Sequence, residues 1–256
     1  MDHLPHPSSV QLAERLSVHV VVATVSAVQR VSPSLVSVTL AHPDAAVLAG
    51  VPGNDVMVRI VEGDQASRRR YSVRSLSPLG DELTLWVHTA HEGPGSRWAQ
   101  RATVGDFVDL VGPRGKIPLA PLADWHLMLG DASSLATFYR LAESIEAPGR
   151  VIFIVETDDP SDALTTTLPE GIGVTGIFVN RDGRVGNSPT GLLNGLAALA
   201  LPLDEGHAYL FAEFSVNRSL ATALKDRGLD PTAISIKNFW RHGEPNRENG
   251  EPDKRS

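Results

Sequence analysis

The amino-acid sequence predicts two domains, an N-terminal antiparallel β-barrel followed by a C-terminal parallel α/β domain. The barrel is indicated by short runs rich in valine, leucine and threonine that fill residues 18–119 and are separated by turn-forming residues. The α/β domain is indicated by strand and helix patterns that alternate from residue 124 onward. A proline-rich joint near 119–124 separates the two patterns, so we place the domains at 18–120 and 124–243.

Six short runs predict the strands of the barrel, because they are rich in valine, leucine and threonine and are separated by proline, glycine, aspartate or asparagine. They cover residues 18–31, 34–42, 55–63, 69–77, 82–90 and 106–115. Between the last two runs, the stretch GPGSRWAQRA at 93–102 predicts a short helix.

The C-terminal domain has the pattern of successive βαβ units. Apolar runs predict its strands at 125–130, 151–156, 173–179, 208–212 and 233–240. Helical periodicity predicts helices at 133–149, 189–201 and 215–228. Since parallel sheets of this kind bind ligands at the carboxyl ends of their strands, we expect ligand contacts at that edge.

Composition excludes several classes of function. The formal net charge of -7 argues against nucleic acid as the partner, because phosphate binding requires a basic field. The sequence has no cysteine, which excludes disulfides, thiolate nucleophiles and cysteine-bound clusters. His88 and His91 are three residues apart, but no carboxylate or cysteine set completes a metal site, so no bound metal is expected.

The two ends of the chain are predicted to be flexible. Residues 1–17 begin with a polar, proline-rich stretch unlike a signal peptide, and residues 244–256 contain almost no apolar side chains. The longest apolar stretch, residues 18–28, is too short to cross a bilayer. We therefore expect a cytoplasmic monomer with no membrane insertion.

Residues 68–75, RRRYSVRS, place four arginines around one tyrosine. Alternate side chains of a strand share a face, so Arg69 and Tyr71 are expected to point one way and Ser72 the other. A tyrosine can stack on an aromatic ring, and an arginine can bind phosphate bidentately. Ser72 could hydrogen-bond a ring nitrogen. The alternative is an edge strand protected by charge.

A second stretch, Gly93–Ser96, precedes the short helix predicted at 93–102. Glycine permits close approach of the backbone, Ser96 can cap the helix, and free N–H groups at a helix N-terminus attract phosphate. The alternative is a tight turn with an ordinary cap.

Together these stretches resemble a known arrangement. R-x-Y-S at 69–72 followed by G-x-x-S at 93–96 resembles the flavin domain of the ferredoxin–NADP reductase superfamily. RRYSVR, GPGSRWA, the LMLGD junction at 127–131 and NFWRHG at 238–243 are, in this order, similar to the siderophore-interacting protein family of ferric-siderophore reductases. The resemblance covers residues 17–243.

The resemblance implies an FAD-dependent oxidoreductase that passes electrons from NAD(P)H, or from ferredoxin, to a ferric siderophore and releases ferrous iron. It also implies the site residues. Cofactor contacts are implied at Arg69, Tyr71, Ser72, Val73, Arg74, His88, Gly93, Gly95, Ser96, Gly130, Asp131 and Trp240, with Tyr71 and Ser72 as the catalytic pair. Contacts to the anionic substrate are implied at Arg74, Arg241 and His242, whereas Arg68 and Arg70 are expected to be solvated.

Two departures from the family pattern bear on the electron donor, and a third concerns a charge that faces the substrate. Ala132 stands where the family has a glutamate after the Gly-Asp junction, and Ala212 stands where it has a glycine. A side chain at 212 could crowd a nicotinamide, so ferredoxin stays open as the donor. In the terminal motif His242 replaces an arginine and can titrate near neutral pH.

The choice between NADH and NADPH depends on residues after the second strand of the α/β domain. Glu156, Thr157 and Asp158 follow that strand, with no arginine nearby in the sequence to bind a 2′-phosphate. This pattern favours NADH. Two broader alternatives remain, a general NAD(P)H–flavin or ferredoxin reductase and a non-catalytic protein that binds flavin or siderophore without using a nicotinamide.

Overall fold

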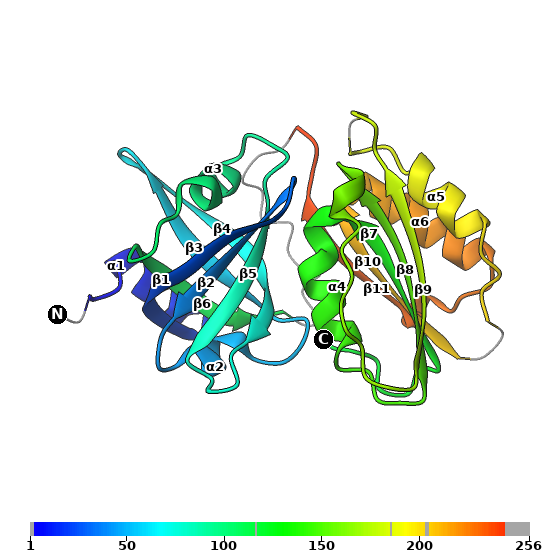
Figure 1. Cartoon of the computed structure of the whole chain (residues 1–256), viewed down its shortest axis with the longest axis horizontal. Coiled ribbons are helices and arrows are strands. Elements are labelled where there is room, and N and C mark those ends of the chain that lie inside the picture. The colour runs from blue at the N-terminus through cyan, green and yellow to red at the C-terminus, as the bar shows by residue number, and fades with distance from the viewer. Residues whose placement is uncertain (1–2, 116, 185, 203–204, 244–256) are drawn as a thin grey trace. The chain divides into compact units, whose positions relative to one another are not determined.

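The computed structural model describes residues 3–115, 117–184, 186–202 and 205–243. The chain divides into two compact units, residues 1–118 and 119–256 (Figure 1). The first contains an antiparallel barrel and the second a parallel sheet with helices, which confirms the predicted fold class. Among the described helices, none combines the length and the apolar character that crossing a membrane would need.

Six strands close the barrel in the order β1-β2-β5-β4-β3-β6. Their bounds are β1 His19–Ser32, β2 Leu35–Ala41, β3 Asp55–Glu62, β4 Gln65–Leu76, β5 Glu82–His88 and β6 Phe107–Arg114. Alternate residues of each strand point inward, as in β5, where Leu83, Leu85 and Val87 are buried. These aliphatic side chains fill the interior of the barrel.

Two helices beside the barrel were not predicted from the sequence. Helix α2 (Ala45–Ala49) inserts Leu48 into the barrel core.

Helix α1 (Pro7–Leu16) corrects the expectation that residues 1–17 are flexible. Leu12 of α1 packs in a small cluster with Met57 and Val111. The backbone N–H of His6 and the hydroxyl of Ser9 both donate to Asp109 of β6, at 3.0 and 2.6 Å, and attach α1 to the barrel. The predicted flexible tail, 244–256, lies outside the described residues.

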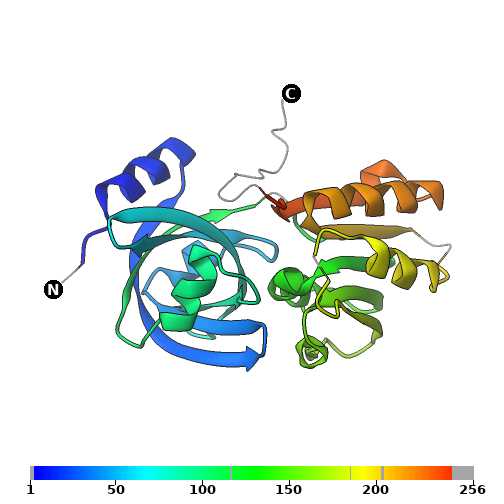
Figure 2. The same cartoon turned by 90° about the horizontal axis from the view of Figure 1, so that it is seen from above.

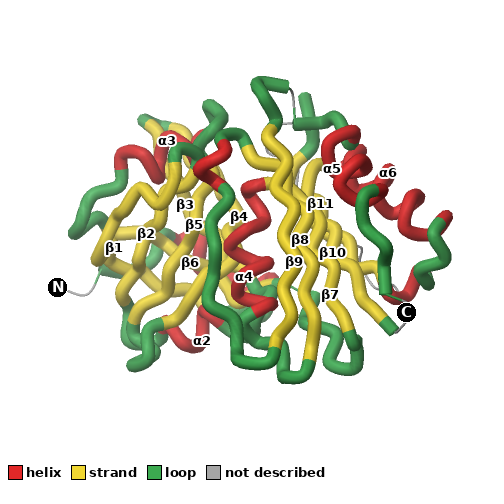
Figure 3. The backbone as a smooth tube through the Cα atoms, turned by 45° about the vertical axis from the view of Figure 1, so that its right-hand side comes forward, coloured by secondary structure: helices red, strands yellow, loops and turns green. Residues whose placement is uncertain are grey.

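The sheet of the second unit has the strand order β11-β10-β7-β8-β9, and every neighbouring pair is parallel. Figure 3 shows these strands in yellow. Its strands are β7 Trp125–Asp131, β8 Gly149–Thr157, β9 Ile172–Asn180, β10 Gly206–Glu213 and β11 Ile234–Trp240. Parallel pairing places the carboxyl ends of all five strands at one edge. The residues that follow these ends are therefore neighbours in space although they are far apart in the sequence.

Helices cover both faces of this sheet (Figure 2). Helices α5 (Thr190–Ala197) and α6 (Phe214–Asp226) pack Leu192, Leu220 and other apolar side chains against one face. Helix α4 (Leu135–Ala142) lies on the other face, where the Phe138 ring stacks on Phe211 with centroids 5.4 Å apart. The predicted helix at 133–149 is shorter in the structure and opens with a 3-10 turn at Ala132–Ser134.

The pair formed by Asp55 and Arg70 is expected to stabilise the barrel. Asp55 is 1% exposed, and Arg70 binds its two carboxylate oxygens with Nε at 2.9 Å and Nη2 at 2.6 Å. Asp55→Ala would leave the guanidinium without this partner and is expected to lower the free energy of unfolding by roughly 3 kcal/mol in urea titrations. Asp64→Ala, an exposed position in the β3–β4 turn, is the control. Equal effects of the two changes would contradict a stabilising role for the pair.

Candidate functional site

Strand β4 and the start of helix α3 (Pro94–Arg101) meet at Gly95. A Cβ atom built on Gly95 would lie 1.9 Å from the hydroxyl oxygen of Tyr71 and 3.5 Å from Cγ of Arg69. Any side chain larger than hydrogen at this position would therefore collide with Tyr71. The structure thus brings the two sequence motifs together and places Arg69 and Tyr71 on the same side of β4, as the strand alternation predicted.

The Tyr71 ring lies between the barrel and α3. It packs against the barrel core and stacks on Trp98 of α3, with centroids 5.9 Å apart and planes 29° from parallel. Burial raises the pKa of Tyr71 well above its usual value, against the opposing effect of Arg69. Tyr71 therefore stays neutral at physiological pH and offers an aromatic face and a hydroxyl.

The first turn of α3 is held by its neighbours and not by a side-chain cap. The N-cap residue is Gly93, which corrects the expectation that Ser96 caps the helix. The hydroxyl of Ser96, 1% exposed, donates instead to the carbonyl of Thr89 at 3.1 Å. Because Gly95 and Ser96 lie in the first turn, their N–H groups have no intrahelical acceptor and can bind an anion.

The remaining residues of β4 around Tyr71 have distinct surroundings. Ser72 is buried and pairs with Asp55 across the β3–β4 ladder. Val73 belongs to the barrel core, and its N–H donates to the carbonyl of Asn54 at 3.2 Å. The Arg74 guanidinium lies over the Trp86 ring, 4.9 Å from its centroid.

Arg68 and Arg70 are not simply solvated, which corrects the expectation from the sequence. Arg70 forms the bidentate pair with buried Asp55. Arg68 donates from Nη2 to the hydroxyl of Ser8 in helix α1 at 2.8 Å. Both arginines therefore connect parts of the first unit, whereas Arg69 lies on the side of β4 that faces Gly95.

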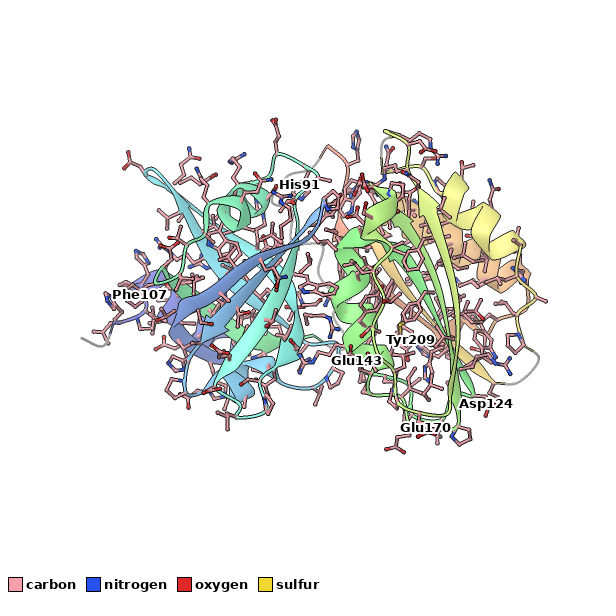
Figure 4. The ribbon with its side chains drawn as sticks, viewed as in Figure 1. His91, Phe107, Asp124, Glu143, Glu170 and Tyr209 are labelled. Carbon is pink, nitrogen blue, oxygen red and sulfur yellow. The ribbon has the colours of Figure 1, made fainter. Side chains whose placement is uncertain are left out.

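The loop between β5 and α3 carries two histidines. His88 ends β5, and its ring centroid lies 5.5 Å from that of His91, which Figure 4 labels beside α3. The Nδ1 atom of His91 accepts from the N–H of Gly93 at 3.1 Å. Across the described ranges of the chain, histidine and acidic side chains form no group of three that could hold a metal.

Glu62, which sequence reasoning missed, attaches α3 to strand β3. Its carboxylate accepts from Arg97 at 2.5 and 2.8 Å and from Arg101 at 2.8 Å. The hydrogen bonds and charges of these two arginines lower the pKa of Glu62 to about 2. The carboxylate thus stays ionised over the physiological pH range and holds α3 against the β3–β4 hairpin.

In the second unit, the predicted residues Asp131 and Trp240 are in direct contact. Trp240 ends β11, and its indole Nε1 donates to Oδ2 of Asp131, the last residue of β7, at 3.0 Å. The other oxygen of Asp131 accepts from the backbone and the hydroxyl of Ser133. At Gly130, directly before Asp131, the backbones of β7 and β10 come close together. A Cβ there would lie 2.2 Å from the carbonyl oxygen of Phe211.

The terminal motif is attached to the start of helix α6. Glu213 caps α6 by accepting from the N–H groups of Ser215 and Val216, and it also accepts from the N–H of His242 at 3.2 Å. Hydrogen bonds outweigh burial and lower the pKa of this carboxyl. The Arg241 guanidinium lies over the Phe214 ring, 4.5 Å from its centroid. Arg241 and His242 therefore lie next to the carboxyl end of β10.

Comparison with known proteins adds to this geometry. A model described as the siderophore-interacting FAD-binding domain matches residues 54–117, which include Arg69, Tyr71 and Gly95. A model described as the siderophore-interacting protein matches residues 123–243, which include Asp131 and Trp240. The chain belongs to the siderophore-interacting protein family.

Three known proteins are similar to this chain over different lengths. Ferric vibriobactin reductase ViuB of Vibrio cholerae is 34% identical over 103 residues, which are 40% of this chain and 38% of that protein. A siderophore utilization protein from T. fusca has a crystal structure with 25% identity, a TM-score of 0.79, and coverage of 91% of this chain and 96% of its own. The ferredoxin NADP+ reductase of Neisseria gonorrhoeae shares the fold, with 18% identity, a TM-score of 0.64, and coverage of 86% and 99%.

Ala212, where the sequence departs from other siderophore-interacting proteins, does not act as expected. It is 1% exposed and belongs to the core between the sheet and helices α5 and α6. Its methyl group therefore points into the core and cannot crowd a ligand, which corrects the prediction made from the sequence. Ala132 is also 1% exposed.

The capping role of Glu213 predicts a pH-dependent contribution to stability. Because its pKa is lower in the folded chain than in the unfolded one, its contribution is present above the ordinary carboxyl pKa and is lost as pH falls through the lowered value. Glu213→Gln is expected to destabilise the protein by about 1 kcal/mol at pH 7. Urea unfolding of both proteins at pH 7 and near pH 3 is expected to show this difference shrinking, and an unchanged difference would contradict the assignment.

Proposed function

We propose that this protein is an FAD-dependent ferric-siderophore reductase, which passes electrons from NAD(P)H or ferredoxin to an iron(III) siderophore and releases iron(II). The observation that carries the proposal is the contact of Arg69 and Tyr71 with Gly95. It joins an aromatic ring, the aliphatic stem of an arginine and the N-terminal turn of a helix in one site, while the Arg69 guanidinium donates to the carbonyl of Arg68 at 2.8 Å. Membership of a family whose N-terminal model is an FAD-binding domain supports the same assignment.

The residues around Gly95 fit FAD in their chemistry. A dinucleotide carries a pyrophosphate, which helix N–H groups and an arginine bind well. The N–H groups of Gly95 and Ser96 and the guanidinium of Arg69 would hold it, and the ring of Tyr71 would stack on the flavin. We propose flavin or ribityl contacts for Ser72, Val73, Arg74 and His88, with Gly93 setting the start of the helix.

FAD, when bound, supplies the capacity to accept two electrons from a nicotinamide and to release them one at a time, as iron(III) requires. The protein itself needs no acid or base for this chemistry. Tyr71 and Ser72 orient the ring, and the barrel core beneath them excludes water. In the first unit, Arg74 supplies positive charge, which suits an anionic ferric chelate better than the acidic remainder of the chain does. In the second unit, Arg241 also carries positive charge, and we propose His242 beside it as a further substrate contact.

The second unit is proposed to receive the nicotinamide at the carboxyl edge of its sheet, at Gly130, Asp131 and Trp240. Two observations support this donor: the fold is shared with a ferredoxin NADP+ reductase, and the methyl group of Ala212 lies in the core. The second observation also weighs against one of the two motives for a non-catalytic binder, and the missing carboxylate at Ala132 stays as the other. Ferredoxin remains the alternative donor.

A general NAD(P)H–flavin or ferredoxin reductase is the second candidate, because the same fold serves a reductase of that kind. Anaerobic absorbance titration of the purified protein with NADH, NADPH and reduced ferredoxin, followed by ferric siderophores, separates the two. Reoxidation by ferric siderophores in preference to ferredoxin, quinone or free flavin is expected. A protein that takes up no FAD would contradict both candidates.

The stacking role of Tyr71 can be tested directly. Tyr71→Ala removes the aromatic face and is expected to weaken FAD binding by about tenfold or more and to shift the flavin absorbance spectrum. Phe107→Ala, which removes an exposed aromatic ring of the same unit, is the control and is expected to leave both unchanged. If flavin content and spectrum of Tyr71→Ala equal those of the wild type, the stacking role is wrong.

A further inference from the structure

Three charged side chains form a cluster at the carboxyl ends of β8 and β9. Arg181, directly after β9, donates from Nε to Glu156 Oε2 at 3.0 Å and from Nη1 to Asp158 Oδ1 at 2.6 Å. The side chains of Arg181 and Glu156 are 10% and 5% exposed, and that of Asp158 is 19% exposed. The carboxylate of Asp158 is therefore the most accessible group of the cluster.

Backbone contacts hold Arg181 in this position. Its N–H donates to the carbonyl of Thr157 at 2.8 Å, which continues the β8–β9 pairing. Gly186 lies against the guanidinium, since a Cβ there would be 2.7 Å from Cζ of Arg181. Gly191, at the start of α5, lies near Glu156, since a Cβ there would be 3.2 Å from Oε1. The buried pair is thus enclosed by the segment that leads into α5.

Arg181 corrects the expectation that no arginine lies near Glu156 and Asp158. Arg181 is far from these residues in the sequence, and the parallel pairing of β8 and β9 brings it beside them. The Arg181 guanidinium nevertheless already binds the carboxylates of Glu156 and Asp158, and the charge of Asp131 also acts on it. An added phosphate would have to compete with these negative charges for one buried cation.

We propose that the Glu156–Arg181–Asp158 cluster selects NADH over NADPH, with Asp158 as the specificity-determining residue. The inference rests on the proposed use of a nicotinamide donor. In dinucleotide-binding α/β sheets, an acidic group after the second strand accepts a hydrogen bond from the ribose 2′-hydroxyl, whereas a free arginine accommodates a 2′-phosphate. Here the accessible carboxylate of Asp158 accepts a hydrogen bond from the 2′-hydroxyl and repels a 2′-phosphate, and Arg181 keeps that carboxylate in place.

The test compares the wild type with Asp158→Asn, which keeps the shape of the side chain and removes its charge. Asp159→Asn removes the same charge one residue further on, where the side chain caps the turn at Pro160–Asp162 and does not contact Arg181 in the described structure. Two readouts are used on the protein as purified. One is calorimetric binding of 5′-AMP and 2′,5′-ADP, and the other is the kcat/KM of flavin reduction by NADH and NADPH.

The wild type is expected to bind 5′-AMP about tenfold more tightly than 2′,5′-ADP and to prefer NADH by a similar factor. Asp158→Asn is expected to shift both ratios about tenfold towards the 2′-phosphorylated compounds, and Asp159→Asn to leave them unchanged. A wild type that prefers 2′,5′-ADP and NADPH, or equal shifts in the two variants, would overturn the proposal. Binding of neither fragment would overturn it too, while reduction of the flavin by ferredoxin and its reoxidation by ferric siderophore would leave the proposed reductase standing.

Discussion

The close approach of Tyr71 to Gly95 is the contact on which the candidate cofactor site depends. Because residue 95 has no side chain, the ring of a barrel strand can reach the first turn of α3. Other contacts then keep the helix at that distance: Trp98 stacks on the ring, Ser96 bonds the loop after β5, and Glu62 binds the helix from β3. An aromatic ring, the side chain of Arg69 and the first turn of a helix are brought together by packing and not by sequence proximity.

Most of the fold could be predicted because its signals are local. The period-2 runs of the barrel and the alternating strands and helices of the second unit each follow from short stretches of sequence. Helix α1 could not be predicted in this way, because it is short and polar and is stabilised by Asp109, about a hundred residues away in the chain.

The site could be predicted only in part, for a related reason. The motif pattern located Arg69, Tyr71 and Gly95, whereas the partners of neighbouring charges are distant in sequence. Strand alternation separates Arg70 from Arg69, but nothing local shows that Arg70 pairs with Asp55. In the second unit, the position of Arg181 beside Glu156 follows from the pairing of parallel strands, and strand order is not readable from one sequence.

The attachment of α3 through Glu62 gives the anion-binding turn an indirect dependence on ionic strength. Helix α3 has eight residues, too few to be stable alone, so its orientation is set by the strands around it. Two partly solvated ion pairs supply much of that restraint, and dissolved salt weakens such pairs. On the proposed assignment, salt would therefore act on a bound pyrophosphate twice, by screening Arg69 and by loosening the helix whose first turn would hold the anion.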